Sequence, residues 1–141
     1  MKSAKWMLPV TLLLLSGLMA AQSITSSTVV ANVPFDFMVN NKIIPAGDLA
    51  VRGVNMDGTV LAVRNFDARK SALATASHSE QAQAATSTVL RFKHYGSQYF
   101  LSEIQIEGSN QTYTLPESRA EAELRAQNAP ASGTTLLASI K

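Results

Sequence analysis

The sequence of 141 residues contains no cysteine. Disulfide bonds, thiol catalysis, CxxC redox chemistry and thiolate zinc sites are therefore excluded. Tryptophan is almost absent as well, with Trp6 the only one in the chain. A domain of about 120 residues can still hold together by burial of apolar side chains alone, and the length suits a single domain.

Long apolar runs are missing after the first residues, where one extends from Trp6 to Met19. Two lysines precede this run and two alanines follow it, the order that is typical of a secretory signal peptide. The run is shorter than the roughly 20 residues that a membrane span needs. We predict a signal peptide over residues 1–21, cleaved after Ala20 or Ala21, with an uncleaved N-terminal anchor as the alternative.

A basic excess is also missing once that segment is removed. Of the 12 Lys and Arg residues, Lys2 and Lys5 lie in the predicted signal, and the remaining ten balance ten Asp and Glu residues. Nucleic-acid binding relies on a basic surface that neutralises phosphates. The balanced charge therefore predicts no nucleic-acid partner. The signal peptide predicts export to the periplasm or extracellular space, with no stable membrane span after cleavage.

Short segments rich in β-branched and apolar residues alternate with turn signals over residues 28–115. This pattern predicts six or seven short antiparallel strands. The clearest turn is NMDGT (55–59), where Gly58 suits the left-handed region of a three-residue hairpin loop. That hairpin pairs Val51 with Val63.

The segment RFKHYGSQYFLSEI (91–104) predicts a second hairpin, with residues 96–98 as its loop. This register places Arg91 opposite Glu103 and Tyr95 opposite Tyr99. Because side chains alternate between the faces of a strand, one apolar face carries Leu90, Phe92, Phe100, Ile104 and Ile106. The tip of this hairpin predicts a contact patch for a partner, made of His94, Tyr95 and Tyr99.

The hydrophobic period changes after Leu115, where LPESRAEAELRAQ predicts a helix. Ser118 and Glu121 have the spacing of a capping box, and Glu121 precedes Arg125 by four residues, which favours an ion pair. We predict a β-rich domain over residues 22–128 that ends in this helix. Residues 129–141 are predicted to be a flexible tail, with a last strand through Leu136, Leu137 and Ile140 as the alternative. The expected fold is mainly β, an antiparallel β-sandwich or small barrel with one C-terminal helix.

Chemical motifs are scarce. His78 and His94 are the two histidines, and neither has the spacing of a metal-binding motif with a neighbouring carboxylate such as Glu80 or Glu103. No G-x-S-x-G nucleophile elbow, phosphate loop or calcium loop is present. Asp36, between two phenylalanines, is expected to face solvent. We therefore predict no catalytic residue, no metal site and no cofactor.

Three segments together resemble an uncharacterised family of small exported β-rich proteins that are frequent in acidobacterial genomes: VPFDFMVNNKIIPAGDLAVR, FKHYGSQYFLSEI and LPESRAEAEL. The resemblance covers about residues 32–124. The chain departs from the family pattern at Ile44, at Leu49 and Ala50, and at residues 103–105. The resemblance implies export and a β-rich domain, and it carries over no catalytic residue.

These observations favour an exported, non-catalytic β domain with a binding or structural role toward an envelope or extracellular partner. Two alternatives stay open, a small secreted hydrolase with a site near His78 or His94, and a lipocalin-like carrier of small ligands. A concave pocket with convergent polar groups would favour an enzyme or a carrier.

Overall fold

Strands make up most of the chain in the computed structural model, which describes residues 28–127 and 131–140. The predicted signal peptide, residues 1–21, lies outside the described residues. The strands are β1 (Thr28–Val33), β2 (Phe37–Val39), β3 (Lys42–Ile44), β4 (Gly47–Gly53), β5 (Val60–Asn65), β6 (Lys70–Thr75), β7 (Ser77–Glu80), β8 (Thr88–Tyr95), β9 (Gln98–Gln105), β10 (Gln111–Thr114) and β11 (Ala131–Ile140). The helix α1 spans Arg119–Ala126. The prediction of a mainly β fold with one helix is confirmed.

The described residues form eleven strands, and the prediction of six or seven is wrong. Part of the difference is local, because one expected strand divides into β6 and β7 at Ala76, which is buried. Two other expected strands divide as well, into β1 and β2 around Pro34 and into β3 and β4 at Pro45, and the eleventh strand comes from the C-terminal segment. Residues 131–140 form β11, so the prediction of a flexible tail is wrong and the alternative of a last strand is correct.

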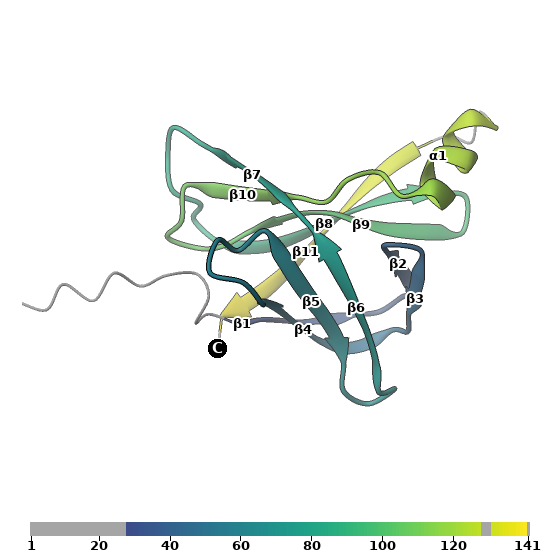
Figure 1. Cartoon of the computed structure of the whole chain (residues 1–141), viewed down its shortest axis with the longest axis horizontal. Coiled ribbons are helices and arrows are strands. Elements are labelled where there is room, and N and C mark those ends of the chain that lie inside the picture. The colour runs from purple at the N-terminus through teal and green to yellow at the C-terminus, as the bar shows by residue number, and fades with distance from the viewer. Residues whose placement is uncertain (1–27, 128–130, 141) are drawn as a thin grey trace, which may run out of the picture.

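The strands follow one another in the order β3-β2-β9-β8-β11-β1-β4-β5-β6, and β7 and β10 pair beside β9. Almost all pairs are antiparallel, and the exception is β2 with β9, joined at Met38 and Phe100. β11 runs from the side of α1 to the start of β1, where the C-terminus lies (Figure 1). It connects the layer that contains β8 and β9 to the layer that contains β4 and β5.

The two ends of this strand order come close together, so that the sheet is barrel-like and nearly closed. The turn between β2 and β3 places Asn40 and Asn41 in the left-handed region, with φ values of 47° and 62°. Asparagine tolerates this region better than most residues, and two such residues in succession match the twist of a two-residue hairpin. The Asn40 side chain then donates a hydrogen bond to the Leu73 carbonyl of β6.

Alternating burial along the strands places the core inside the curved sheet. In β5 the buried residues Leu61, Val63 and Asn65 alternate with more exposed ones. Asn65 is buried because its amide donates to the Pro45 and Ala46 carbonyls, which fixes the bend before β4. The largest fully buried apolar side chains are Phe37, Phe92, Ile44, Leu90, Ile104, Val33, Val39 and Val63. Burial of one such side chain contributes about 1.5–3 kcal/mol.

The hairpin between β4 and β5 confirms its prediction. Val51 pairs with Val63, and Gly58 in the connecting loop has a φ of 67°. Asn55 closes the loop, since its side chain donates to Thr59 Oγ1 and accepts from the backbone N–H of Val60. A local turn signal was sufficient here because both strands and the loop lie within 20 residues.

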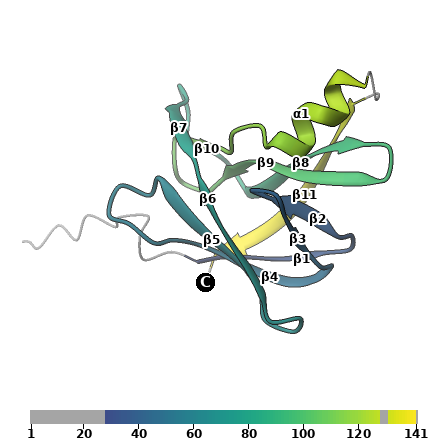
Figure 2. The ribbon, with the colours of Figure 1, turned by 45° about the vertical axis from the view of Figure 1, so that its right-hand side comes forward.

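The helix α1 lies above the hairpin of β8 and β9 (Figure 2). Ser118 caps it as predicted, and its hydroxyl accepts a hydrogen bond from the backbone N–H of Glu121 at 3.2 Å. The predicted ion pair of Glu121 with Arg125 is wrong. Arg125 instead contacts Glu117, and Glu121 turns toward the sheet, where it is buried.

Candidate binding site

The hairpin of β8 and β9 ends in a shorter loop than the sequence predicted. Tyr95 pairs with Gln98 and His94 pairs with Tyr99, so only Gly96 and Ser97 lie in the loop. Gly96 has a φ of 58°, a conformation that glycine adopts without steric cost. The predicted pairing of Tyr95 with Tyr99 is therefore wrong.

Further along the hairpin, Arg91 pairs with Glu103 as predicted, and their side chains form an ion pair. The hairpin thus has the predicted register at Arg91 and a register shifted by one residue from Phe92 to the loop. A β-bulge between Arg91 and Phe92 causes this shift. The extra residue is Ser102. Its hydroxyl donates to the Arg91 carbonyl at 3.0 Å, and its own carbonyl accepts from the backbone N–H of Leu115 at 2.9 Å. Hydrogen bonds to β8 and to the segment after β10 thus hold the bulge in place.

The bulge reverses which side chains of β9 face inward. Phe92 lies opposite Leu101 in the core, whereas Phe100 lies opposite the exposed Lys93 on the outer face. The prediction that Phe92 and Phe100 share a face is wrong. Side chains alternate between the two faces, so one extra residue in β9 places Phe100 on the face opposite to the predicted one. Phe100 is nevertheless buried and packs edge-to-face with Tyr95, with ring centroids 5.8 Å apart.

Tyr95 does not belong to the surface. Only 5% of it is exposed, and its hydroxyl donates to Glu121 Oε1 at 3.1 Å. The Lys93 ammonium lies 3.8 Å from the same oxygen. Burial, and next the hydrogen bond to Glu121, raise the pKa of Tyr95 above its usual value of 10.0. The prediction of Tyr95 as part of a contact patch is therefore wrong, because α1 covers it.

His94 and Tyr99 are half-buried and stack on one another, with ring centroids 4.2 Å apart. The other face of Tyr99 stacks on Phe35 at 3.8 Å. His94 Nδ1 also lies 3.1 Å from Ser132 Oγ of β11. Since both faces of the Tyr99 ring are covered, only its edge and its hydroxyl can meet a partner. The structure thus brings two of the three predicted patch residues together, as a rigid stack.

Beside this stack lies a groove of about 430 Å³. It lies at the end of the β8–β9 hairpin, next to the one position, Met38 with Phe100, where β2 pairs with β9. Its lining is mainly apolar and comes from β2, β3, the tip of the β8–β9 hairpin and α1. The lining residues are Asp36, Phe37, Met38, Ile43, Ser97, Gln98, Tyr99 and Ala120.

Ile43 is the residue of this groove that the sequence analysis missed. It is 63% exposed, whereas its neighbour Ile44 is 1% exposed. Strand alternation in the KII segment could have found it, since two successive isoleucines cannot both face the core. Asp36 faces outward as expected, and its carboxylate accepts a hydrogen bond from the backbone N–H of Ala46 at 2.8 Å.

The two histidines lie on different strands, His78 on β7 and His94 on β8. His78 is exposed, and its ring centroid lies 6.2 Å from that of Tyr113. Over residues 28–127 and 131–140, no group of three or more His, Asp or Glu side chains is arranged to hold a metal ion.

Comparisons with protein-family models, with curated proteins and with solved structures found no match to this chain. In the part of the chain that the structure describes, no helix has the length and apolarity needed to cross a bilayer.

Proposed function

We propose that the protein is an exported, non-catalytic β domain that binds a protein partner in the envelope or extracellular space through the groove beside Tyr99. The observation that carries this proposal is Ile43, a large apolar side chain that is 63% exposed at the rim of an apolar groove. Covering such a side chain with a partner is favourable, because each Å² of apolar surface removed from water lowers the free energy by about 25 cal/mol.

The groove suits contact better than chemistry. Its one carboxylate, Asp36, already accepts a hydrogen bond from the backbone of Ala46. Its aromatic ring, Tyr99, is held on both faces by Phe35 and His94. A preformed, rigid aromatic edge beside apolar side chains is typical of binding sites, because little conformational entropy is lost when a partner docks.

The location rests on the order of residues at the N-terminus, with lysines before an apolar run and alanines after it. The near-zero charge of the chain after residue 21 favours a protein partner over a nucleic acid. We also take the sheet to be a small barrel rather than a sandwich, because Asn40 of the β2–β3 turn reaches Leu73 on the far end of the strand order.

The export proposal is tested by the intact mass of the protein recovered from the envelope and the medium of the producing cell. The mass expected is that of a chain beginning after Ala20 or Ala21. Its absorbance at 280 nm should then come from Tyr95, Tyr99 and Tyr113 alone, because Trp6 is removed. A mature protein that retains Trp6 would contradict cleavage.

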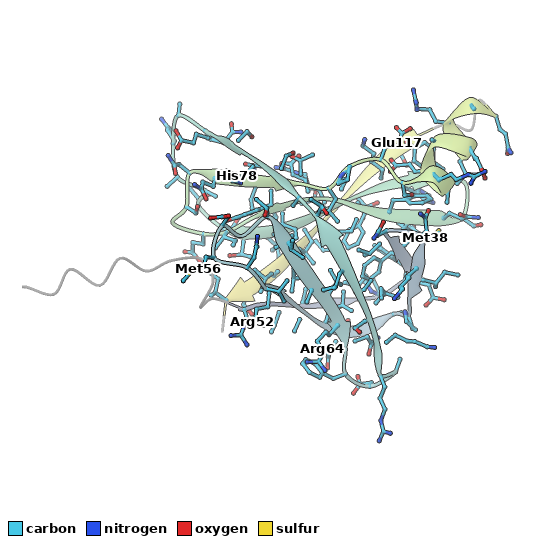
Figure 3. The ribbon with its side chains drawn as sticks, in the orientation of Figure 1. Met38, Arg52, Met56, Arg64, His78 and Glu117 are labelled. Carbon is cyan, nitrogen blue, oxygen red and sulfur yellow. The ribbon has the colours of Figure 1, made fainter. Side chains whose placement is uncertain are left out.

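The binding proposal is tested with a photo-crosslinking amino acid at position 43, introduced in the producing cell. A control carries the same amino acid at Met56, which is 95% exposed. Met56 lies on the opposite side of the molecule from Met38 of the groove (Figure 3). We expect a discrete crosslinked species from position 43 and none from position 56, and Gln98→Arg should abolish it. Equal crosslinking at both positions, or none at position 43, would contradict the proposal.

A further inference from the structure

The strand β11 has a free edge along most of its length. On one side it pairs with β8 at eight successive positions, from Ala131 with Tyr95 to Ala138 with Thr88. On the other side it pairs with β1 only at Ser139 and Ile140. In an antiparallel pair, only every second residue of a strand forms backbone hydrogen bonds with one neighbouring strand, and the residues between them direct their N–H and C=O groups toward the opposite edge. Residues 131–138 therefore present backbone donors and acceptors that no described strand pairs.

This edge is open to solvent. From Ala31 onward, β1 separates from β11 and leaves a groove of about 460 Å³ between them. The outward side chains of β11 are exposed, and Leu137 is 77% exposed. A Cβ atom added at Gly133 would meet no atom within 4 Å. Across the groove, Phe66 is 60% exposed, so apolar side chains flank the free edge on two sides.

The edge also lacks the features that usually protect such strands. Proteins prevent unwanted pairing at a sheet edge with charged residues, proline or very short strands. The sequence of residues 132–140 is SGTTLLASI, which contains no charge and no proline. An exposed, uncharged edge of eight residues pairs readily with another strand, and the absence of charge means that two copies of it do not repel one another.

We propose that two copies of the protein associate through these edges, with their β11 strands antiparallel about a twofold axis. A twofold interface uses the same surface on both copies, so the edge needs to complement only itself. The free stretch, residues 131–138, has its midpoint between Thr134 and Thr135, and the axis passes near these two residues. The pairing joins the sheets of the two copies into one sheet that continues from β8 through both β11 strands.

The absence of cysteine makes a direct test possible, because a single introduced cysteine has no other thiol to react with. Cysteine is introduced separately at Gly133, Thr135 and Leu137, on the exposed side of β11. A matched control carries cysteine at Met56, which is 95% exposed and lies in the loop between β4 and β5, outside β11. Mild oxidation is followed by separation of monomer and dimer under denaturing conditions.

Disulfide dimers are expected to form at least tenfold faster at Thr135 than at Met56, because only residues near the twofold axis meet their own copies. Light scattering of the unmodified mature protein should give the mass of a dimer. The variant Leu137→Lys adds a charge to the edge and should weaken the dimer at least tenfold, whereas Thr114→Lys, on a strand with both edges paired, should not.

A mature protein that remains monomeric up to millimolar concentration overturns the proposal. Crosslinking at Met56 as fast as at every position of β11 overturns it too, since random collision then explains the dimers. Neither result bears on the proposed function, because the groove of Ile43 and the groove beside β11 share no lining residue.

Discussion

The Asn40 side-chain amide donates a hydrogen bond of 3.1 Å to the Leu73 carbonyl, and this contact joins the two ends of the strand order. It fastens the β2–β3 hairpin to β6 at the place where the barrel-like sheet lacks strand pairing. The same turn contacts α1, because Asn41 Oδ1 accepts from the Ala120 backbone N–H at 3.4 Å. Two successive asparagines thus meet two different elements from one tight turn.

Replacement of Asn40 by glycine should lower the free energy of unfolding by about 0.5–1.5 kcal/mol, the usual contribution of one hydrogen bond. Glycine tolerates the positive φ of this position, so the change removes the contact without backbone strain. Asn41→Gly is the matched control, since its φ is also positive and its side-chain contact is longer. Urea denaturation gives the difference, and amide exchange in β6 should accelerate only in Asn40→Gly. Equal effects of the two variants would show that the contact to Leu73 contributes no more than the longer contact of Asn41 with Ala120.

Replacement of Phe92 by alanine should cost about 3–5 kcal/mol, the range observed for large cavities in a core. Phe92 is 1% exposed and packs edge-to-face against Phe35 and Phe37. Glu103→Gln should cost less than about 1 kcal/mol, because its ion pair with Arg91 is partly exposed. Chemical denaturation of both variants checks the contrast. A Glu103→Gln protein that fails to fold would mean that charge, not burial, determines this hairpin.

The stability of the protein should fall as the pH rises above about 10, because burial raises the pKa of Tyr95 in the folded state. The folded state then retains a proton that the unfolded chain loses, so each further rise in pH favours unfolding. Below pH 10 the contribution is fully present. Burial raises the pKa of Tyr113 as well, so part of the effect persists when Tyr95 is replaced.

Tyr95→Phe should therefore show a shallower loss of stability as the pH rises above 10. At pH 7 it should be less stable by about 1–3 kcal/mol, since the buried Glu121 carboxylate loses a hydrogen-bond donor. Tyr99→Phe, at a half-buried tyrosine, serves as the control. Urea denaturation at several pH values measures both effects. Identical alkaline profiles for Tyr95→Phe and the unmodified protein would contradict the role assigned to this hydroxyl.

Gly58→Ala should destabilise the protein by about 1–2 kcal/mol, because the φ of 67° strains any residue that carries a Cβ. The added atom would lie 3.5 Å from the Tyr113 ring, an ordinary contact, so the backbone supplies the cost. Gly53→Ala, in the same hairpin, should be nearly neutral, because its φ is ordinary and the added Cβ would make only an ordinary contact of 3.7 Å with the Gly58 Cα. Thermal unfolding of the pair checks this. Equal losses would indicate that packing, and not the left-handed conformation, makes glycine necessary at position 58.

Features that depend on neighbouring residues were predictable from the sequence. The hairpin of β4 and β5 and the cap at Ser118 follow from conformational preferences of a few residues, and tertiary contacts leave both intact. Burial of Phe37 and Val39, with Asp36 outside, follows from simple alternation. Each of these features is encoded within one turn or one strand.

The site depended on contacts between distant segments. The bulge at Ser102 exists because Leu101 fills the core while Phe100 fills the space beneath α1, and neither demand is visible from β9 alone. The two successive apolar residues were a signal that strict alternation breaks there. Likewise, Tyr95 leaves the surface only because Glu121, 26 residues later, lies over it.

The sequence by itself determined that the chain lacks thiol chemistry, that strands dominate, and where the tightest turns lie, because composition and local backbone preferences decide these properties. Only the tertiary structure decided that residues 131–140 form a strand between β8 and β1. That segment has too few large apolar residues for its own pattern to favour a strand over a flexible tail, and the strand was only the alternative prediction. Backbone pairing with β8 and the contact of Leu136 with the core supply the missing free energy, and both exist only after the rest of the sheet has folded.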